Sequence, residues 1–165
     1  MKSYLILYPA FLMIFLTFFI YLKNRLDAKK AYKSGDVEGK YFKTYNGNVP
    51  DYLETSRQTL KNQFELPIIF YFLIILLYIN GTITIYELIL SWTFSISRYL
   101  HCYIRLTSNY VPHRAKIFTF GYMILIILSI DVLIHLTNPP WSNASDLICT
   151  PPLNHCKLFC GSFYI

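Results

Sequence analysis

Several signatures of familiar soluble enzymes are missing from this 165-residue sequence. It has no internal repeat, no glycine-rich phosphate loop, no serine-triad pattern and no paired catalytic carboxylates. Charged residues are also scarce, at 15%, whereas apolar residues reach 55% and the mean hydropathy is +0.38. A typical soluble domain has about 25% charged residues, so this excess of apolar side chains has to face lipid. The composition excludes an ordinary soluble domain and indicates an integral membrane protein.

Four apolar stretches approach the length that crosses a bilayer, whose core of about 30 Å takes about 20 helical residues. We expect helices at about 4–22, 60–79, 82–106 and 116–136. A secretory signal peptide is the rival interpretation of the first stretch, but its apolar run is long and no small-residue cleavage site follows it. Short turns join the last three stretches, which predicts antiparallel neighbours. The predicted fold class is an all-α membrane protein, an antiparallel four-transmembrane-helix bundle.

Basic residues are distributed unequally around these stretches. Only Lys2 precedes the first one, whereas a basic group follows it at once: Lys23, Arg25, Lys29, Lys30 and Lys33. The positive-inside rule then places both termini outside and the connection 23–59 in the cytoplasm, as a solvated loop without a packed core of its own. The net charge of +6 is explained by these membrane-flanking residues, so we expect membrane lipid and no nucleic acid as a partner.

Polar residues gather at the cytoplasmic ends of the predicted helices. The second stretch carries two in its first turns, the third carries three in its last turns, and one precedes the fourth. They are Asn62 and Glu65, then Arg98, His101 and Arg105, then Arg114. The spacings i,i+3 and i,i+3,i+7 place each set on one helix face. Because ionisable groups within a membrane span are costly, they usually face a bundle interior or a wet cavity, which makes them candidates for function.

A purely structural interpretation of the same residues stays open. Glu65 would pair with Arg98 to hold two helices together, while Arg105 and Arg114 would extend to lipid phosphates. Pro67 adds a local expectation, because it cannot donate a hydrogen bond to the carbonyl group of Gln63 and so predicts a bend near Glu65. Such a bend would open a pocket, although prolines are also ordinary in membrane helices.

Read in order, these residues resemble the pattern of the MAPEG family, the membrane-associated proteins in eicosanoid and glutathione metabolism. The resemblance rests on the segment 62–67 (Asn-Gln-Phe-Glu-Leu-Pro), the segment 98–101 (Arg-Tyr-Leu-His), Asn109 and Arg114. The version in this chain is similar to the uncharacterised bacterial-type branch. It implies a MAPEG-like homotrimer that binds glutathione as co-substrate between neighbouring subunits, at the cytoplasmic ends of the helices.

The resemblance also implies a role for each residue. Asn62 and Glu65 match positions that hold the peptide part of glutathione, and Arg98 and His101 match positions on the third helix that line the same site. Arg105 departs from the pattern but is expected to hold the tripeptide with them. Arg114 matches the catalytic arginine that stabilises the thiolate, as a fixed guanidinium should, because it favours the charged form of a thiol. The implied function is a glutathione-dependent transferase or peroxidase acting on lipophilic electrophiles. The alternative is a non-catalytic membrane scaffold that binds an anionic amphiphile or lipid headgroup in the same pocket.

Two positions depart from the family pattern. Glutathione-using members generally have an arginine one turn before the asparagine, where this chain has Gln58. A position on the third helix that is often tyrosine in the enzymes is Arg105. These departures suggest the hypothesis that one positive charge has moved from the second helix to the third.

The segment 137–165 is a C-terminal tail that contains cysteine and proline and does not resemble the family. Cys149, Cys156 and Cys160 lack the C-x-x-C spacing of common zinc sites, and an outside tail favours oxidised cysteines, so we predict no metal site. Near the outer end of the fourth helix, Asp131 and His135 are four residues apart and are expected to pair or to reach interfacial water.

Overall fold

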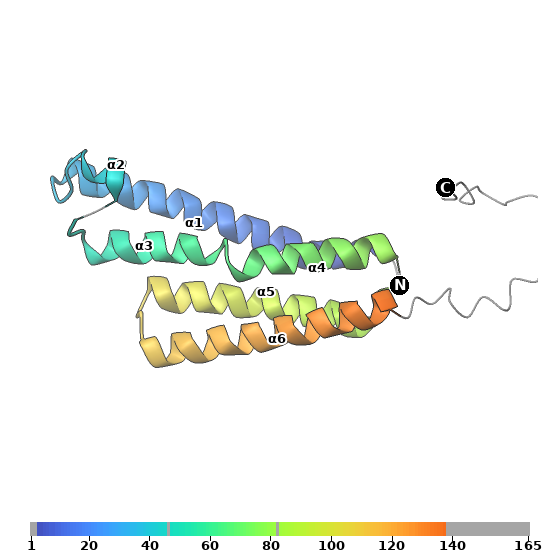
Figure 1. The fold of residues 1–165 in the computed structure, drawn as a ribbon. Coiled ribbons are helices and arrows are strands. Elements are labelled where there is room, and N and C mark those ends of the chain that lie inside the picture. Colours follow the sequence, from blue (N-terminus) through green and yellow to red (C-terminus); the bar gives the residue numbers. More distant parts are fainter. Residues whose placement is uncertain (1–2, 46, 82, 138–165) are drawn as a thin grey trace, which may run out of the picture.

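The computed structural model describes residues 3–45, 47–81 and 83–137, and the regular structure in them is helical. The segments, in chain order, are η1 (Ser3–Ile6), α1 (Leu7–Lys33), α2 (Tyr41–Thr44), α3 (Asp51–Asn62), α4 (Leu66–Asn80), α5 (Ile85–Leu106) and α6 (Val111–Thr137). They form an elongated antiparallel bundle in which α3 and α4 together run back along α1, and α5 and α6 complete the pairing (Figure 1).

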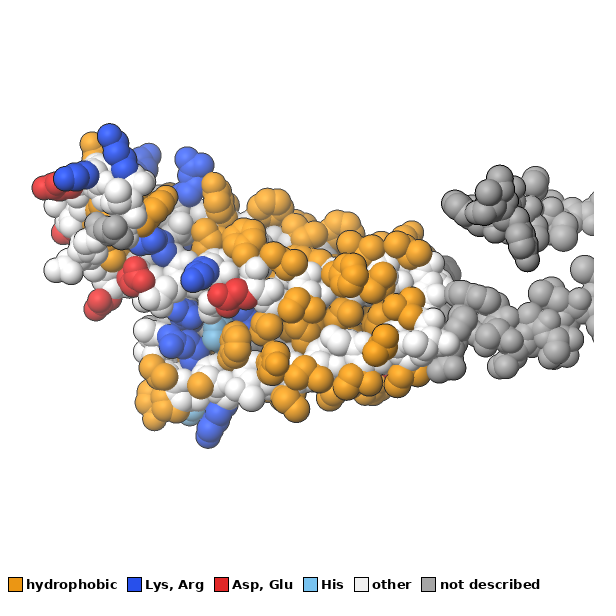
Figure 2. Space-filling model, viewed as in Figure 1, with side chains coloured by type: hydrophobic (Ala, Val, Ile, Leu, Met, Phe, Trp, Pro, Cys, Tyr) orange, Lys and Arg blue, Asp and Glu red, His pale blue; other side chains and the backbone are white. Residues whose placement is uncertain are grey.

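The two ends of the bundle differ in chemistry. At one end, which we call the polar end, lie α2, the start of α3 and the turn between α5 and α6 (Figure 1). At the other, the terminal end, Ser3 Oγ donates to the Gly81 carbonyl oxygen at 3.1 Å, and α6 also finishes there. The space-filling view shows Lys, Arg, Asp and Glu side chains gathered at the polar end and apolar side chains along the rest of this face (Figure 2). An apolar surface of this extent suits a lipid environment.

Three helical stretches in the described residues are long and apolar enough to cross a membrane: Ser3–Lys33, Asp51–Asn80 and Val111–Thr137. They agree with the predicted class of all-α membrane protein. Helix α5 has 22 residues, about 33 Å at 1.5 Å per residue, but it is not among the three. Charged residues make α5 less apolar than the other three stretches, and three of them, Glu87, Arg98 and Arg105, are buried. Polar groups of this kind are expected to face the protein interior rather than lipid.

The predicted loop 23–59 differs in the structure from a solvated connection. Helix α1 continues to Lys33, and α3 already begins at Asp51. A small apolar cluster is buried between them, formed by Ala31, Val37, Tyr41 and Leu53. The sequence looked loop-like here because charged residues and glycines separate the apolar ones. The helices nevertheless continue, because their few apolar side chains can be buried against one another.

The predicted bend near Pro67 is a complete break between two helices. Helix α3 ends at Asn62, and α4 begins at Leu66 with Pro67 in its first turn, where proline's missing N–H costs nothing. Asn62 and Glu65 therefore do not share the face of one continuous helix, as their i,i+3 spacing predicted. They lie on either side of the break.

Helix α5 contacts its neighbours through hydroxyl groups and small residues. Ser95 Oγ donates to the carbonyl oxygen of Pro9 in α1 at 3.2 Å. The Tyr99 hydroxyl donates to the carbonyl oxygen of Leu12, also in α1, at 2.8 Å. On the side facing α6, a Cβ atom added to Gly121 would lie 2.7 Å from Ser97 Oγ. Close backbone approach at small residues is the usual basis of helix packing in membranes.

We expect Gly121→Leu to separate α5 from α6 and to lower the free energy of unfolding in detergent by about 1–3 kcal/mol, the usual cost of overpacking. Gly121→Ala is the graded control, because its single methyl group adds much less volume at the contact with Ser97 Oγ and should cost less. Unfolding in mixed micelles measures both variants. Equal stability of the leucine variant and the wild type would contradict this packing.

Candidate functional site at the polar end

The six residues singled out in the sequence come together at the polar end of the bundle. Asn62 ends α3 and Glu65 precedes α4. Arg98, His101 and Arg105 are buried on α5, and Arg114 lies in the first turn of α6. The break between α3 and α4 therefore faces the last turns of α5 and the start of α6.

Two adjoining cavities are lined by most of this cluster. The larger, about 480 Å³, is lined by Glu54, Arg57, Gln58, Lys61, Asn62, Glu65 and Arg105. The smaller, about 310 Å³, is lined by Asn62, Glu65, His101, Arg105, Arg114, Ala115, Phe118 and Thr119. The two cavities share Asn62, Glu65 and Arg105, so an amide, a carboxylate and a guanidinium lie between them. Five of the six singled-out side chains line this space.

Arg105 connects α5 to α3 by direct hydrogen bonds. Its Nη2 donates to Gln58 Oε1 at 2.6 Å. The Asn62 amide, oriented so that both of its polar atoms are satisfied, accepts from Arg105 Nη1 at 2.8 Å and donates to the Gln58 carbonyl oxygen at 3.2 Å. Gln58 Nε2 in turn donates to Glu54 Oε1 at 2.6 Å. The Arg105 guanidinium is thus held beside the position where the family pattern has an arginine on the second helix.

Arg114 is held at the edge of the smaller cavity by the turn before α6. Its Nη1 donates to Asn109 Oδ1 at 2.6 Å, and Asn109 has the positive φ of +48° that asparagine tolerates better than most residues. His101 Nδ1 lies 3.3 Å from the Arg114 carbonyl oxygen, which ties α5 to the same turn. The N-terminus of α6 adds partial positive charge at this point. The arrangement favours a bound anion.

Arg98 has a different position from the other five. It is only 1% exposed and lines neither cavity. Its guanidinium lies 5.2 Å from the centre of the Phe118 ring, and in the part of the chain that the structure describes none of its three nitrogens has a hydrogen-bond partner. No ion pair joins it to Glu65 within those residues. The structural interpretation in which this pair fastens two helices is therefore not supported.

Two buried polar residues were missed in the sequence, one beside the cluster and one at the terminal end of the bundle. Gln63, 1% exposed, donates from Nε2 to the sulfur of buried Cys102 at 3.0 Å. Glu87 is fully buried near the start of α5, where it forms a capping box with Thr84. The Thr-x-x-Glu pattern at 84–87 was a readable signal for that cap. No sequence signal indicates what else Glu87 meets, because its other neighbours are more than forty residues away in the chain.

The helical bundle, its membrane-spanning stretches and its polar end define an integral membrane protein of the helical-bundle class. A family model described as the MAPEG family matches residues 5–134, so the chain belongs to that family, as its motifs predicted. Members of the family include glutathione transferases and peroxidases. The searches of curated proteins and of solved structures give no match.

Proposed function

We propose that this protein is a glutathione-dependent membrane transferase or peroxidase that acts on lipophilic electrophiles, with the site at the polar end. The observation that carries the proposal is the pair of adjoining cavities, which Asn62, Glu65 and Arg105 share and which Arg114 and His101 also line. Apart from Arg105, which departs from the family pattern, these residues are the ones that the pattern assigns to glutathione binding and to the thiolate.

The charges of the cavity complement those of glutathione, which carries two carboxylates, one ammonium group, two peptide units and a thiol. Arg57, Lys61 and Arg105 line the larger cavity and supply positive charge for the carboxylates. Glu65 is exposed and can accept from the ammonium group, while the amides of Gln58 and Asn62 suit the peptide units. The tripeptide would therefore lie across the break between α3 and α4.

Arg114 is the proposed catalytic residue. A guanidinium fixed by Asn109 favours the thiolate of bound glutathione over the thiol, and the thiolate is the nucleophile. In a transferase step, the thiolate sulfur forms a bond to an electrophilic carbon atom as the leaving group departs with the bonding electrons. Ala115 and Phe118 give the smaller cavity an apolar side where a lipophilic reactant can be accommodated.

We further propose that the protein is a homotrimer, with its termini outside and the polar end in the cytoplasm. The orientation follows from the basic residues around α1 and α2, which the positive-inside rule assigns to the cytoplasm. The trimer follows from the family, and a neighbouring subunit would cover the open side of both cavities.

The test is a titration of the detergent-purified protein with glutathione, followed by near-ultraviolet absorbance of the thiolate. We expect a thiolate signal in the wild type and a loss of about tenfold or more in its formation in Arg114→Ala, because a hydrogen bond to a charged group contributes about 1.5–3 kcal/mol. Lys116→Ala is the matched control. It removes an exposed cation from the same helix, outside both cavities, and should leave the signal unchanged.

Failure would take two distinguishable forms. If the wild type binds glutathione but gives no thiolate signal, the site binds the ligand without activating its thiol. No binding of glutathione, together with binding of an anionic lipid or detergent headgroup that Arg114→Ala weakens, would favour the non-catalytic scaffold. In that case the basic lining of the larger cavity would serve a phosphate group.

A further inference from the structure

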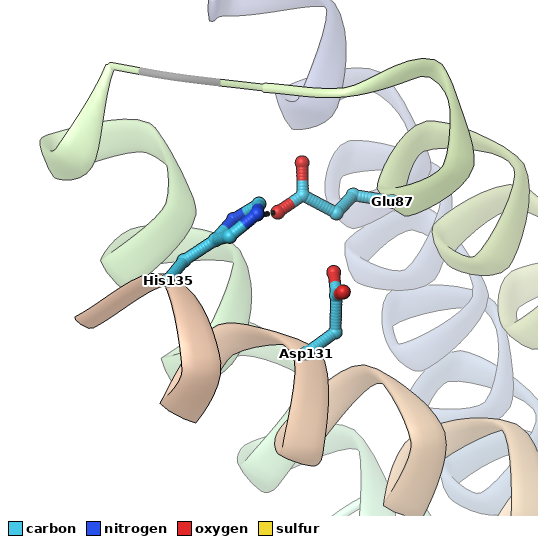
Figure 3. A group of neighbouring side chains, drawn as sticks. All are labelled: Glu87, Asp131 and His135. Atoms are coloured by element: carbon cyan, nitrogen blue, oxygen red, sulfur yellow. Dashed lines mark ion pairs between the residues drawn. The ribbon is translucent and has the colours of Figure 1, made fainter. Parts of the chain in front are cut away.

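A second polar cluster lies at the terminal end, opposite the proposed glutathione site. Glu87 comes from the first turn of α5, and Asp131 and His135 lie one turn apart on α6. Their side chains converge between the two helices (Figure 3). One ligand-type atom from each residue lies within 4.8 Å of the other two. His135 Nδ1 is 2.7 Å from Glu87 Oε1.

The charges of this cluster do not balance by themselves. Glu87 is fully buried, and Asp131 and His135 are partly buried. Within the described residues, no lysine or arginine forms an ion pair with any of the three. A protonated His135 would supply one positive charge against two carboxylates. Carboxylates removed from water are costly unless they are paired or bind a metal ion, so the cluster calls for a second positive charge.

The free atoms of the cluster are turned toward one another. Glu87 Oε1, Asp131 Oδ2 and His135 Nδ1 are all buried and make no hydrogen bond, and the 2.7 Å contact between nitrogen and oxygen lacks hydrogen-bond geometry. The other oxygen of Glu87, Oε2, accepts from Thr84 N at 2.6 Å and from Thr84 Oγ1 at 2.9 Å. The cap of α5 therefore orients the carboxylate, as outer hydrogen bonds orient the ligands of metal sites, and leaves Oε1 free.

The geometry points to a binding site for one divalent transition-metal ion, with zinc as the best fit, formed by Glu87, Asp131 and His135 between α5 and α6. One imidazole nitrogen and two carboxylate oxygens are a donor set that zinc accepts, whereas calcium and magnesium prefer oxygen ligands throughout. Donor atoms at about 2.0–2.2 Å from a tetrahedral zinc ion lie about 3.4 Å apart, and the ligand atoms of this cluster already lie within 4.8 Å of one another. With His135 neutral, the ion balances both carboxylates.

A metal ion at this site would join the start of α5 to the end of α6. Three protein ligands leave a fourth position open for water. Because the ion binds the folded bundle and not the separated helices, it stabilises the fold by an amount that grows with the logarithm of its concentration above the dissociation constant. The site is independent of glutathione, because it lies at the other end of the bundle.

The experiment uses the full-length protein, purified in detergent without a polyhistidine tag and freed of metal by a chelator. Equilibrium dialysis against Zn²⁺ measures the number of ions bound per chain, and thermal unfolding measures the stabilisation. We expect His135→Gln and Asp131→Asn each to bind one ion fewer than the wild type and to lose the zinc-dependent rise in unfolding temperature. His113→Gln is the matched control, because it removes an exposed histidine at the polar end and should keep both properties.

The cysteines of the segment 137–165 are rival ligands, and absorbance with Co²⁺ distinguishes them. A site of nitrogen and oxygen ligands gives weak visible bands, whereas thiolate ligands add intense near-ultraviolet absorption. The proposal is overturned if the wild type and His135→Gln bind the same number of zinc ions, or if neither is stabilised by zinc. The cluster would then contain only an ion pair between His135 and Glu87, which joins α5 and α6 without a metal ion. Circular dichroism confirms that each variant is folded.

Discussion

Replacing Arg98 by methionine is expected to make the ligand-free protein harder to unfold. Arg98 is 1% exposed, and no hydrogen bond satisfies its guanidinium within the described residues. An arginine at the centre of a membrane helix costs about 2.5–3.5 kcal/mol on insertion scales, and methionine fills similar space without that cost. We expect a gain of the same order in the free energy of unfolding. Thermal unfolding in detergent, with and without glutathione, measures it.

The same change should weaken glutathione binding, because Arg98 stacks on Phe118, which lines the smaller cavity, and contributes positive charge beneath it. Arg105→Met is the matched control. It makes the same substitution on the same helix, but at a guanidinium that is already hydrogen-bonded to Gln58 and Asn62, and it should destabilise the protein. The prediction is wrong if Arg98→Met destabilises the protein as much as Arg105→Met does.

Arg105→Tyr is expected to lower the affinity for glutathione by about 10–100-fold, the effect of losing one charge-assisted hydrogen bond of about 1.5–3 kcal/mol. Adding Gln58→Arg in the same chain should restore much of that loss. The physical reason is the 2.6 Å hydrogen bond between Arg105 Nη2 and Gln58 Oε1. It places the guanidinium from α5 beside the side chain that the family pattern would replace by arginine. Isothermal titration of the two single variants and the double variant measures the coupling.

A matched control for this cycle is Arg25→Ala, which removes an arginine that lines neither cavity. The hypothesis of a relocated charge fails if Arg105→Tyr binds glutathione as well as the wild type does. It also fails if adding Gln58→Arg to Arg105→Tyr does not restore affinity for glutathione, because an arginine on α3 would then be unable to replace the arginine on α5. The first result would remove Arg105 from the proposed glutathione site, whereas the second would reject only the exchange of positions between α3 and α5. Neither result affects membership of the family.

The proposed zinc site and the proposed glutathione site require different properties of the two ends of the bundle. At the polar end, the break between α3 and α4 leaves an open, basic space for a ligand. At the terminal end, α5 and α6 come together around acidic side chains and one imidazole. Small residues such as Ser97 and Gly121 hold the same two helices together between these ends. Loss of zinc should therefore change stability without abolishing binding at the polar end.

Local sequence patterns were sufficient for the class of the protein. Long apolar stretches indicated membrane helices, and the residues from Asn62 to Arg114 indicated the family, which is confirmed. The gathering of polar groups at one end followed from alternating helix direction, which needs only the lengths of helices and turns. The extent of α1 was underestimated, because the apolar partners that stabilise its last turns, such as Tyr41 and Leu53, lie well beyond it in the chain.

The sequence by itself determined that this chain is a helical membrane protein of the MAPEG family and which side chains share its polar end, because helix periodicity and apolar length are local properties. Only the tertiary structure decided how those side chains are used. In the structure, the helix is interrupted between Asn62 and Glu65, and Arg98 is buried away from the cavities. Arg105 is hydrogen-bonded to Gln58. The tertiary structure also brings Glu87 to Asp131 and His135. These outcomes depend on the packing of distant helices, which no local pattern encodes.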